Sequence, residues 1–334
     1  MNKIERIKAA INGEKVDKLP YAFWSHLPGI DLDPEKLAKE TYNFYKKYDI
    51  DFVKTMNNGM YSIEDFGCKI DYSQVPLGGV AKITETPILC GDDWEKIKAV
   101  KVTEGSLGRE LYSLKLLLDY LKDEPVPVVF TVFSPLTTAE KLSSKKIKEH
   151  IKEGKGDLIH KALQEITNTT CELVKKAIEM GVSGIFFASQ LTSFDEMTEE
   201  EYLEYGKPYD LQVLESASKG WFNIIHAHGN NIMFDILKTY PAQVFNWHAW
   251  ETFPDIDEAR DLAHKCLMGG IKRMDITNCC KNEVRNQIYK SLKILKRKKH
   301  ILTPGCVIRY PLNEEMLKYI KNIKEDLEKD FVNI

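Results

Sequence analysis

Two histidines separated by one residue, together with a distant cysteine, have the side chains best suited to hold a metal ion. His226-Ala-His228 closes an apolar run that begins at Phe222, and Cys306 closes a second apolar run much later in the chain. In an extended segment the side chains of residues i and i+2 point to the same face, roughly 7 Å apart. Zinc prefers imidazole nitrogen and thiolate sulfur, and three protein ligands leave one position open for chemistry. The pattern therefore predicts zinc at His226, His228 and Cys306; the alternative is a hydrogen-bonded histidine pair beside a buried, inert cysteine.

Short β-like runs alternate with longer amphipathic segments along the whole chain. We expect strands over residues 21–26, 52–57, 126–134, 184–190, 222–228, 244–250, 266–271 and 300–306. We expect helices over residues 34–48, 105–121, 157–180, 198–218, 231–239, 255–264, 282–295 and 313–327. Because each of eight strands is followed by a helix and no Pro/Gly/Ser-rich linker interrupts them, the chain is predicted to be one α/β TIM barrel of the (β/α)8 type spanning residues 1–334.

In a parallel α/β barrel the chemistry takes place where the strands run into the loops that follow them. Polar residues end most of the predicted strands; beyond the three candidate ligands they are His26, Lys54, Asn57, Asn58, Ser134, Gln190, Asn230, Asn246, His248 and Arg273. We predict that His26, Asn57, Gln190, His226, His228, His248 and Cys306 line one cavity. For a single member such as Ser134 or Gln190, structural hydrogen bonding is the alternative.

Roles for these residues follow from their chemistry. We expect His248, His26 and Lys54 to be catalytic, with His248 acting as an acid/base or holding a ligand in place and Lys54 meeting an anionic group. We expect the substrate to contact Asn57, Asn58, Gln190, Asn230 and the aromatic wall residue Trp247.

Composition narrows the class of protein. The 334 residues carry a net charge of −3, which gives no electrostatic reason to expect nucleic acid, and no apolar run is long enough to span a bilayer. The basic run at 296–300 lies at the C-terminal end of a predicted helix, where positively charged side chains stabilise the helix. We therefore expect this run to be a solvated face. Seven cysteines without even spacing, and no apolar segment at the start, predict a reduced, cytoplasmic setting.

Several motifs resemble the uroporphyrinogen decarboxylase superfamily over nearly the whole chain. Residues 6–20 are similar to that family's opening helix and the entry to its first strand. Later landmarks are Asp92-Asp-Trp-Glu, Phe130-Thr-Val-Phe-Ser-Pro135, Gly184-Ile-Phe-Phe-Ala and Gly305-Cys306. The resemblance implies a distorted (β/α)8 barrel in a single domain, in agreement with the alternation of strands and helices.

The sequence departs from the true decarboxylases of this family at the site. Those enzymes bind a tetrapyrrole with an arginine-rich segment after the first strand and an aspartate after the second. Here residues 23–29 contain no arginine, and the amides Asn57 and Asn58 stand in place of the carboxylate. Losing a charge-assisted clamp on a polyanion costs several kcal/mol of binding. Porphyrinogen decarboxylation is therefore disfavoured.

The cobalamin-associated methyltransferase branch is more similar at the site, because it holds zinc with His-x-Cys on the fifth strand and a cysteine on the eighth. In this chain His228 replaces the middle cysteine, which makes the zinc a stronger Lewis acid, and the acceptor need not be a thiol. The resemblance implies a zinc-dependent methyltransferase that exchanges a methyl group between a corrinoid presented by a partner protein and a small acceptor. The alternatives are a metal-free decarboxylase-like lyase and a non-catalytic corrinoid- or tetrapyrrole-binding protein.

Overall fold

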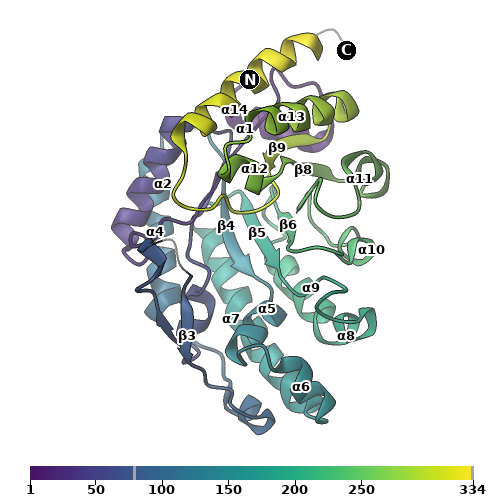
Figure 1. Cartoon of the computed structure of the whole chain (residues 1–334). Helices are drawn as coiled ribbons and strands as arrows, with labels where there is room; N and C mark the ends of the chain where they lie inside the picture. The colour runs from purple at the N-terminus through teal and green to yellow at the C-terminus, as the bar shows by residue number, and fades with distance from the viewer. Residues whose placement is uncertain (78–79, 332–334) are drawn as a thin grey trace.

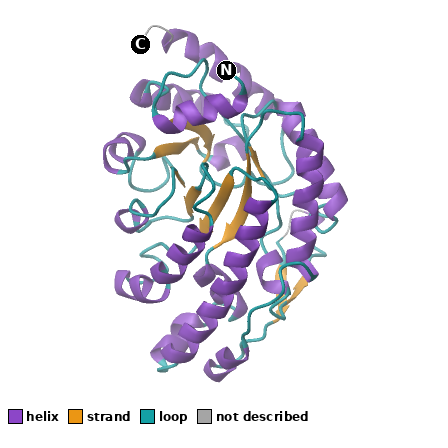
Figure 2. Cartoon of the chain, turned by 180° about the vertical axis from the view of Figure 1, so that it is seen from behind, coloured by secondary structure: helices purple, strands orange, loops and turns teal. Residues whose placement is uncertain are grey.

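The computed structural model describes residues 1–77 and 80–331, and at its centre lies a curled parallel sheet. Its seven strands follow one another in the order β1 (Val53–Lys54), β4 (Val128–Phe133), β5 (Gly184–Ser189), β6 (Ile224–Ala227), β7 (Val244–Trp247), β8 (Cys266–Ile271) and β9 (His300–Pro304). Every residue of these strands is buried. Helices cover the outer face of the curled sheet (Figure 1). Seen from behind, the strands again lie inside the layer of helices (Figure 2).

The first predicted strand, residues 21–26, closes the ring between β9 and β1 as an extended segment rather than a regular strand. On one side Tyr21 forms a parallel bridge with Leu302, and on the other its carbonyl accepts a hydrogen bond of 2.8 Å from the Asp51 amide. The Tyr21 amide donates to the Asp51 carboxylate at 2.9 Å instead of to a backbone carbonyl, which interrupts the ladder. The predicted distorted α/β barrel is confirmed, with this segment in the place of one strand.

The strand predicted over residues 52–57 is also shorter than expected. Side-chain hydrogen bonds replace part of its backbone hydrogen bonding to β4. The Thr131 amide donates to the Thr55 hydroxyl at 2.9 Å, and the Thr131 hydroxyl donates to the Thr55 carbonyl at 2.9 Å. Regular pairing of β1 with β4 is therefore limited to Val53 and Lys54. The chain beyond Thr55 is free to turn into the loop that carries Asn57.

Helices surround the barrel in the order in which they occur in the sequence. The longer ones are α1 (Lys3–Asn12), α2 (Pro34–Tyr48), α4 (Gly105–Leu121), α7 (Gly156–Glu179), α9 (Lys207–Ser216), α13 (Lys281–Leu295) and α14 (Glu314–Glu328). The shorter ones are α3 (Tyr61–Glu64), α5 (Pro135–Leu142), α6 (Ile147–Lys152), α8 (Glu199–Tyr205), α10 (Phe234–Leu237), α11 (Ile256–Leu262) and α12 (Arg273–Thr277). Within the described residues, none of them is both long and apolar enough to cross a membrane.

Three predicted helices also differ from the structure. The helix expected over residues 198–218 is broken at Gly206, where a Cβ would lie 2.4 Å from the Tyr202 ring, and Pro208 follows. The helices expected over residues 231–239 and 255–264 shrink to α10 and α11. An antiparallel hairpin of β2 (Lys69–Asp71) and β3 (Lys82–Glu85), which was not predicted, stands apart from the central strands (Figure 2).

Aromatic rings fill part of the barrel interior. The Trp24 ring lies 5.6 Å from that of Phe186 and 6.4 Å from that of Phe52, and Phe52 in turn packs edge-on against Phe222 at 5.1 Å. Trp24 and Phe186 also line a cavity, so these rings separate it from the remaining core. The site is thus supported by closely packed, rigid side chains.

Candidate metal centre

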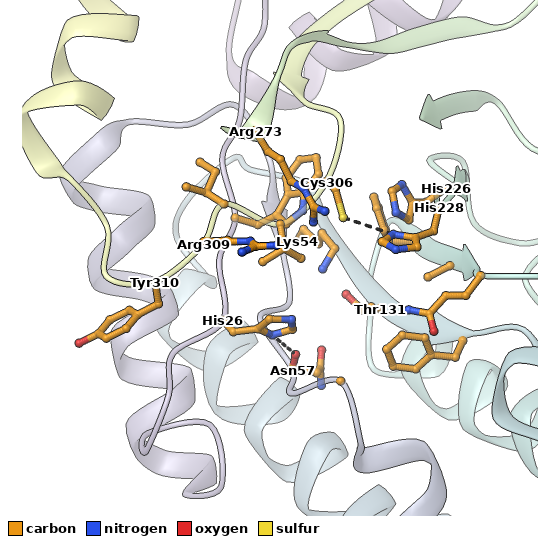
Figure 3. A pocket seen from close by; sticks show the side chains of 18 of the residues that line it. His26, Lys54, Asn57, Thr131, His226, His228, Arg273, Cys306, Arg309 and Tyr310 are labelled. Carbon is orange, nitrogen blue, oxygen red and sulfur yellow. Dashed lines mark hydrogen bonds between the residues drawn. The ribbon is translucent and has the colours of Figure 1, made fainter. Parts of the chain in front are cut away.

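Four side chains with metal-binding atoms meet at the carboxyl ends of neighbouring strands. His226 lies on β6 and His228 directly follows it, His248 follows β7, and Cys306 lies two residues beyond β9. One ligand atom from each of the four lies within 4.8 Å of the others. The Cys306 sulfur is 3.6 Å from His228 Nδ1, and a dashed line marks this contact in Figure 3. The structure therefore brings the three predicted ligands together and adds His248 to them.

A hydrogen-bonded amide fixes the orientation of His226. Parallel pairing of β6 with β7 places Asn246 opposite His226, and His226 Nδ1 lies 2.6 Å from the Asn246 side-chain oxygen. The Asn246 amide nitrogen donates to the Met268 carbonyl at 2.7 Å, which identifies its oxygen as the acceptor. His226 Nδ1 is thus the protonated nitrogen, and Nε2 keeps its lone pair for a metal.

His248 has one nitrogen in an ion pair and one without a partner. Its Nδ1 lies 3.4 Å from a carboxylate oxygen of Glu251, which is three residues further along the same loop. Its Nε2 is buried and has no hydrogen-bond partner among the residues that the structure describes. Burial lowers the pKa of His248, but the nearby Cys306 and Glu251 outweigh burial and raise it to about 9. A metal would displace the proton from this nitrogen, and a buried nitrogen without a partner then fits a metal ligand.

The neighbouring imidazoles also lower the pKa of the Cys306 thiol. Burial raises the pKa of the Cys306 thiol, but contacts with His226, His228 and His248 outweigh burial and hold it well below its usual value. A thiolate is the form of cysteine that binds metals. A group of one thiolate and three imidazoles, with one nitrogen oriented by Asn246 and another left without a partner, offers the donor types that zinc prefers and includes the three protein ligands that a catalytic zinc site uses.

The centre opens into a cavity of about 390 Å³. Six of the seven residues predicted to share a cavity line it, namely His26, Asn57, Gln190, His226, His228 and Cys306. His248 is absent from the lining and contributes to the ligand group from beside it. Lys54 lies on the same wall, and Figure 3 shows His26 and Asn57 facing the ligand group across the space.

Burial governs the charge of Lys54 and His26. Lys54 is 6 % exposed, and its amine lies 4.7 Å from the centre of the Phe186 ring and donates to the Thr55 carbonyl at 3.2 Å. Burial lowers its pKa from 10.5 to about 7. Burial, with help from Lys54, lowers the pKa of His26 to about 4. His26 is therefore neutral at neutral pH; its Nδ1 lies 3.1 Å from the Asn57 carbonyl and must donate to it, which leaves Nε2 as an acceptor.

A buried carboxyl group holds Asn57 in place. The Asn57 amide nitrogen donates to Glu110 at 2.6 Å, and Arg109 binds the other oxygen of Glu110 at 3.0 Å. Burial raises the pKa of Glu110 to about 7. The Asn57 side-chain oxygen is buried without a partner among the described residues, so this acceptor is available to a ligand.

Three residues predicted to contact the substrate lie away from the cavity lining. Asn58 turns its side-chain oxygen toward the Met60 amide at 2.9 Å, and Asn230 is exposed on the loop after β6. Trp247 is fully buried and donates to the Pro254 carbonyl at 3.0 Å, so its ring packs the core. Since successive side chains of a strand alternate in direction, Trp247 points away from the interior that its neighbour Asn246 faces.

Sequence reasoning missed two residues of this region. Arg309 lines the cavity from the loop after β9, and Glu251 pairs with His248. Each lies three residues beyond a candidate ligand, in a loop at the carboxyl end of a strand. That spacing is the only signal that could have singled them out, because loop conformation decides whether such a side chain points inward.

The fold and the site define an α/β barrel with a thiolate and imidazole group at the carboxyl end of its strands. The family model described as uroporphyrinogen decarboxylase (URO-D) matches residues 2–324, so the chain belongs to that family. The chain is 21% identical over 325 residues to the methylcobamide:CoM methyltransferase MtbA of Methanosarcina acetivorans, covering 91% of this chain and 92% of that protein. It is 22% identical over 199 residues to the uroporphyrinogen decarboxylase of Corynebacterium glutamicum, covering 58% and 53%.

Solved structures share the fold. A methyltransferase from Methanosarcina mazei superposes with a TM-score of 0.82 at 19% identity, covering 98% of this chain and 99% of that one. A B12-independent methionine synthase from Shewanella superposes with a TM-score of 0.57 at 14% identity, covering 95% and 97%. These likenesses confirm the barrel architecture predicted from the sequence.

Proposed function

We propose that the chain is a zinc-dependent methyltransferase that exchanges a methyl group between a corrinoid, presented by a partner protein, and a small acceptor. The observation that carries the proposal is the group of His226, His228, His248 and Cys306, whose ligand atoms lie within 4.8 Å of one another beside the cavity. The likeness to MtbA along nearly the full length of both chains supports the methyl transfer and the corrinoid partner.

His226, His228 and Cys306 would hold the metal, because they combine ligand atoms with a position on the cavity wall. Zinc bound there would lower the pKa of the acceptor and so favour a nucleophile at neutral pH. His248 lies beside the cavity and does not line it. The side of the metal that faces the cavity would therefore stay open for an acceptor. Glu251 keeps His248 oriented toward the ligand group.

The remaining residues of the cavity bind and orient the acceptor. His26 Nε2 and the Asn57 side-chain oxygen both accept hydrogen bonds, so they suit a hydroxyl, thiol or amine. Trp24, Phe133 and Phe186 supply apolar walls that exclude water from the reacting end. The volume suits a small acceptor rather than a whole tetrapyrrole, which favours methyl transfer over the decarboxylase-like alternative.

Metal analysis and a methyl-transfer assay test this proposal together. The protein, purified without added metal and then incubated with zinc, should hold one zinc per chain and consume methylcobalamin in the presence of a suitable acceptor. Cys306→Ser should lose both properties, because a hydroxyl is a far poorer zinc ligand than a thiolate. The control Cys279→Ser, which alters an exposed thiol outside the ligand group, should keep both. Full metal content in the Cys306 variant, or a wild-type chain that binds no zinc, would overturn the proposal.

A further inference from the structure

Glu110 is a buried carboxyl group that lies behind the cavity wall rather than on it. It belongs to α4, it is 1 % exposed, and it is absent from the cavity lining. Its two oxygens have different partners. Oε2 accepts a hydrogen bond of 2.6 Å from the Asn57 amide nitrogen, and Oε1 accepts one of 3.0 Å from Arg109 Nε. Glu110 thus connects a residue of the cavity wall to a cation behind it.

Arg109 fixes the direction of the hydrogen bonds in this connection. Its guanidinium only donates, and on its other side Glu64 accepts a hydrogen bond of 3.1 Å from Nη2. The oxygen of Glu110 that faces Arg109 must therefore stay an acceptor. A proton on the side chain of Glu110 has to lie on Oε2, which is the oxygen that faces Asn57.

Asn57 can present either end of its amide to the cavity. Its nitrogen is bound to Glu110, and its oxygen is buried without a hydrogen-bond partner among the described residues. Figure 3 shows Asn57 beside His26 at the cavity wall. A half-turn of the amide exchanges nitrogen and oxygen while the shape of the side chain stays nearly the same. Because an ionised Glu110 only accepts, it holds the Asn57 nitrogen and leaves the oxygen for a ligand.

We infer that Glu110 is a positioning residue that decides whether the ligand in this cavity has to donate a hydrogen bond to Asn57 or accept one from it. While Glu110 is ionised, Asn57 offers its oxygen, and the ligand donates. When Oε2 carries a proton, that proton is donated to the Asn57 oxygen, the amide turns, and its nitrogen faces the ligand. The inference rests on the proposed function only in taking the cavity as the site of the methyl acceptor.

The groups around Glu110 bring its two protonation states within reach near neutral pH. Burial raises the pKa of Glu110 to about 7, although Arg109 acts to lower it. Asp31, in the loop before α2, acts to raise it further. Tyr61 on α3 stays uncharged, because burial and the nearby Glu110 raise its pKa well above 10. Glu64, also on α3, is paired with Arg109.

Glu110→Gln tests the inference, because Arg109 requires the oxygen of the new amide and so directs its nitrogen to Asn57. The probes are small bicyclic molecules of similar size: indole donates a hydrogen bond, 1-indanone accepts one, and benzofuran does neither well. Dissociation constants are measured by NMR titration of metal-depleted protein at about pH 8.5, where Glu110 of the wild type is ionised. The wild type should bind indole about three- to tenfold more tightly than benzofuran.

The decisive quantity is the affinity for 1-indanone. Glu110→Gln should bind it about three- to tenfold more tightly than the wild type does, because the Asn57 nitrogen then faces the ligand. His26 accepts hydrogen bonds in both proteins, so the preference for indole should shrink in the variant rather than vanish. The control Asp119→Asn makes the same exchange of carboxyl for amide on the exposed face of α4 and should leave every dissociation constant unchanged.

A change of pH gives a second measurement. Lowering the pH to about 5.5 protonates Glu110, so the ratio of the two affinities should shift toward 1-indanone about threefold or more further in the wild type than in Glu110→Gln. Other groups of the cavity titrate in both proteins and cancel in this comparison. If Glu110→Gln does not fold, Asn57→Ala, which has no amide to turn, replaces it as the reference.

Two results would overturn the inference. One is a folded Glu110→Gln variant that binds 1-indanone no more tightly than the wild type, because Glu110 would then only support the structure. The other is a pH-dependent shift of equal size in the wild type and in the reference variant, because protonation of Glu110 would then not turn the Asn57 amide.

The metal experiment fails independently of this one. Glu110→Gln should bind zinc as the wild type does, because Glu110 is not part of the ligand group. A chain that binds no zinc but gains affinity for 1-indanone in the variant would refute the proposed function and keep the role of Glu110. A chain that binds zinc without this gain would refute the role of Glu110 alone.

Discussion

Replacing Lys54 by methionine should stabilise the protein. The amine is buried beside Phe186 and Trp24, with the Thr55 carbonyl as its hydrogen-bond acceptor. Burial lowers its pKa from 10.5 to about 7, which corresponds to about 5 kcal/mol against the charged form in the folded state. Losing the hydrogen bond to Thr55 costs about 1 kcal/mol. We therefore expect Lys54→Met to raise the free energy of unfolding by about 4 kcal/mol at about pH 6.

The pH dependence identifies the cause. A lysine whose folded-state pKa is lowered destabilises the protein fully below the folded pKa of about 7, and this cost fades as the pH rises toward 10.5. The wild-type protein should therefore gain stability over this range, and the advantage of Lys54→Met should be about 3 kcal/mol smaller at about pH 9 than at about pH 6.

Urea denaturation of metal-depleted protein at the two pH values measures both quantities. Lys122→Met, which changes an exposed lysine at the end of α4, serves as the control and should alter stability little at either pH. A Lys54→Met variant that is less stable than the wild type at about pH 6, or an advantage that does not change with pH, would refute the argument that burial destabilises this amine.

Three further predictions concern buried polar groups. Asn246→Leu should weaken zinc binding about 10- to 100-fold, measured by competition with a chelator, because His226 Nδ1 loses its acceptor. Burial raises the pKa of Asp210 from 3.8 to about 7, so wild-type stability should fall as the pH rises between these values, and denaturation of Asp210→Asn should show this dependence reduced. Trp247→Phe should cost about 1 kcal/mol of stability through the lost hydrogen bond to the Pro254 carbonyl, while methyl-transfer activity stays unchanged; a loss of activity in the folded variant would return Trp247 to the substrate site.

The fold could be predicted because its signals are local and repeated. Seven of the expected strands pair in the parallel sheet, and long helices such as α2 and α7 lie close to their predicted bounds. The errors occur where a side chain or a single residue overrides the pattern. The Asp51 carboxylate interrupts pairing at Tyr21, and Gly206 with Pro208 divides an expected helix.

The site could be predicted in part, because polar residues at the carboxyl ends of the strands lie on the face of the barrel where the active site forms. That rule selected His26, Asn57, Gln190 and Lys54 as well as the candidate ligands, and the structure places all of them on one cavity. It could not select among neighbours in a loop. Asn58 and Asn230 are as polar as Asn57, yet their side chains turn elsewhere.

The sequence by itself determined which chemical groups are available and on which strands they lie, because residue type and periodicity are written in the chain. Only the tertiary structure decided that His248 lies beside the three predicted ligands and that Arg309 joins Arg273 and Lys54 around the cavity. The lowered pKa of Lys54 also comes from its burial among side chains of other strands. Curling the sheet into a barrel brings together residues that are distant in the sequence, and distance and burial, which no local pattern encodes, set how their charges interact.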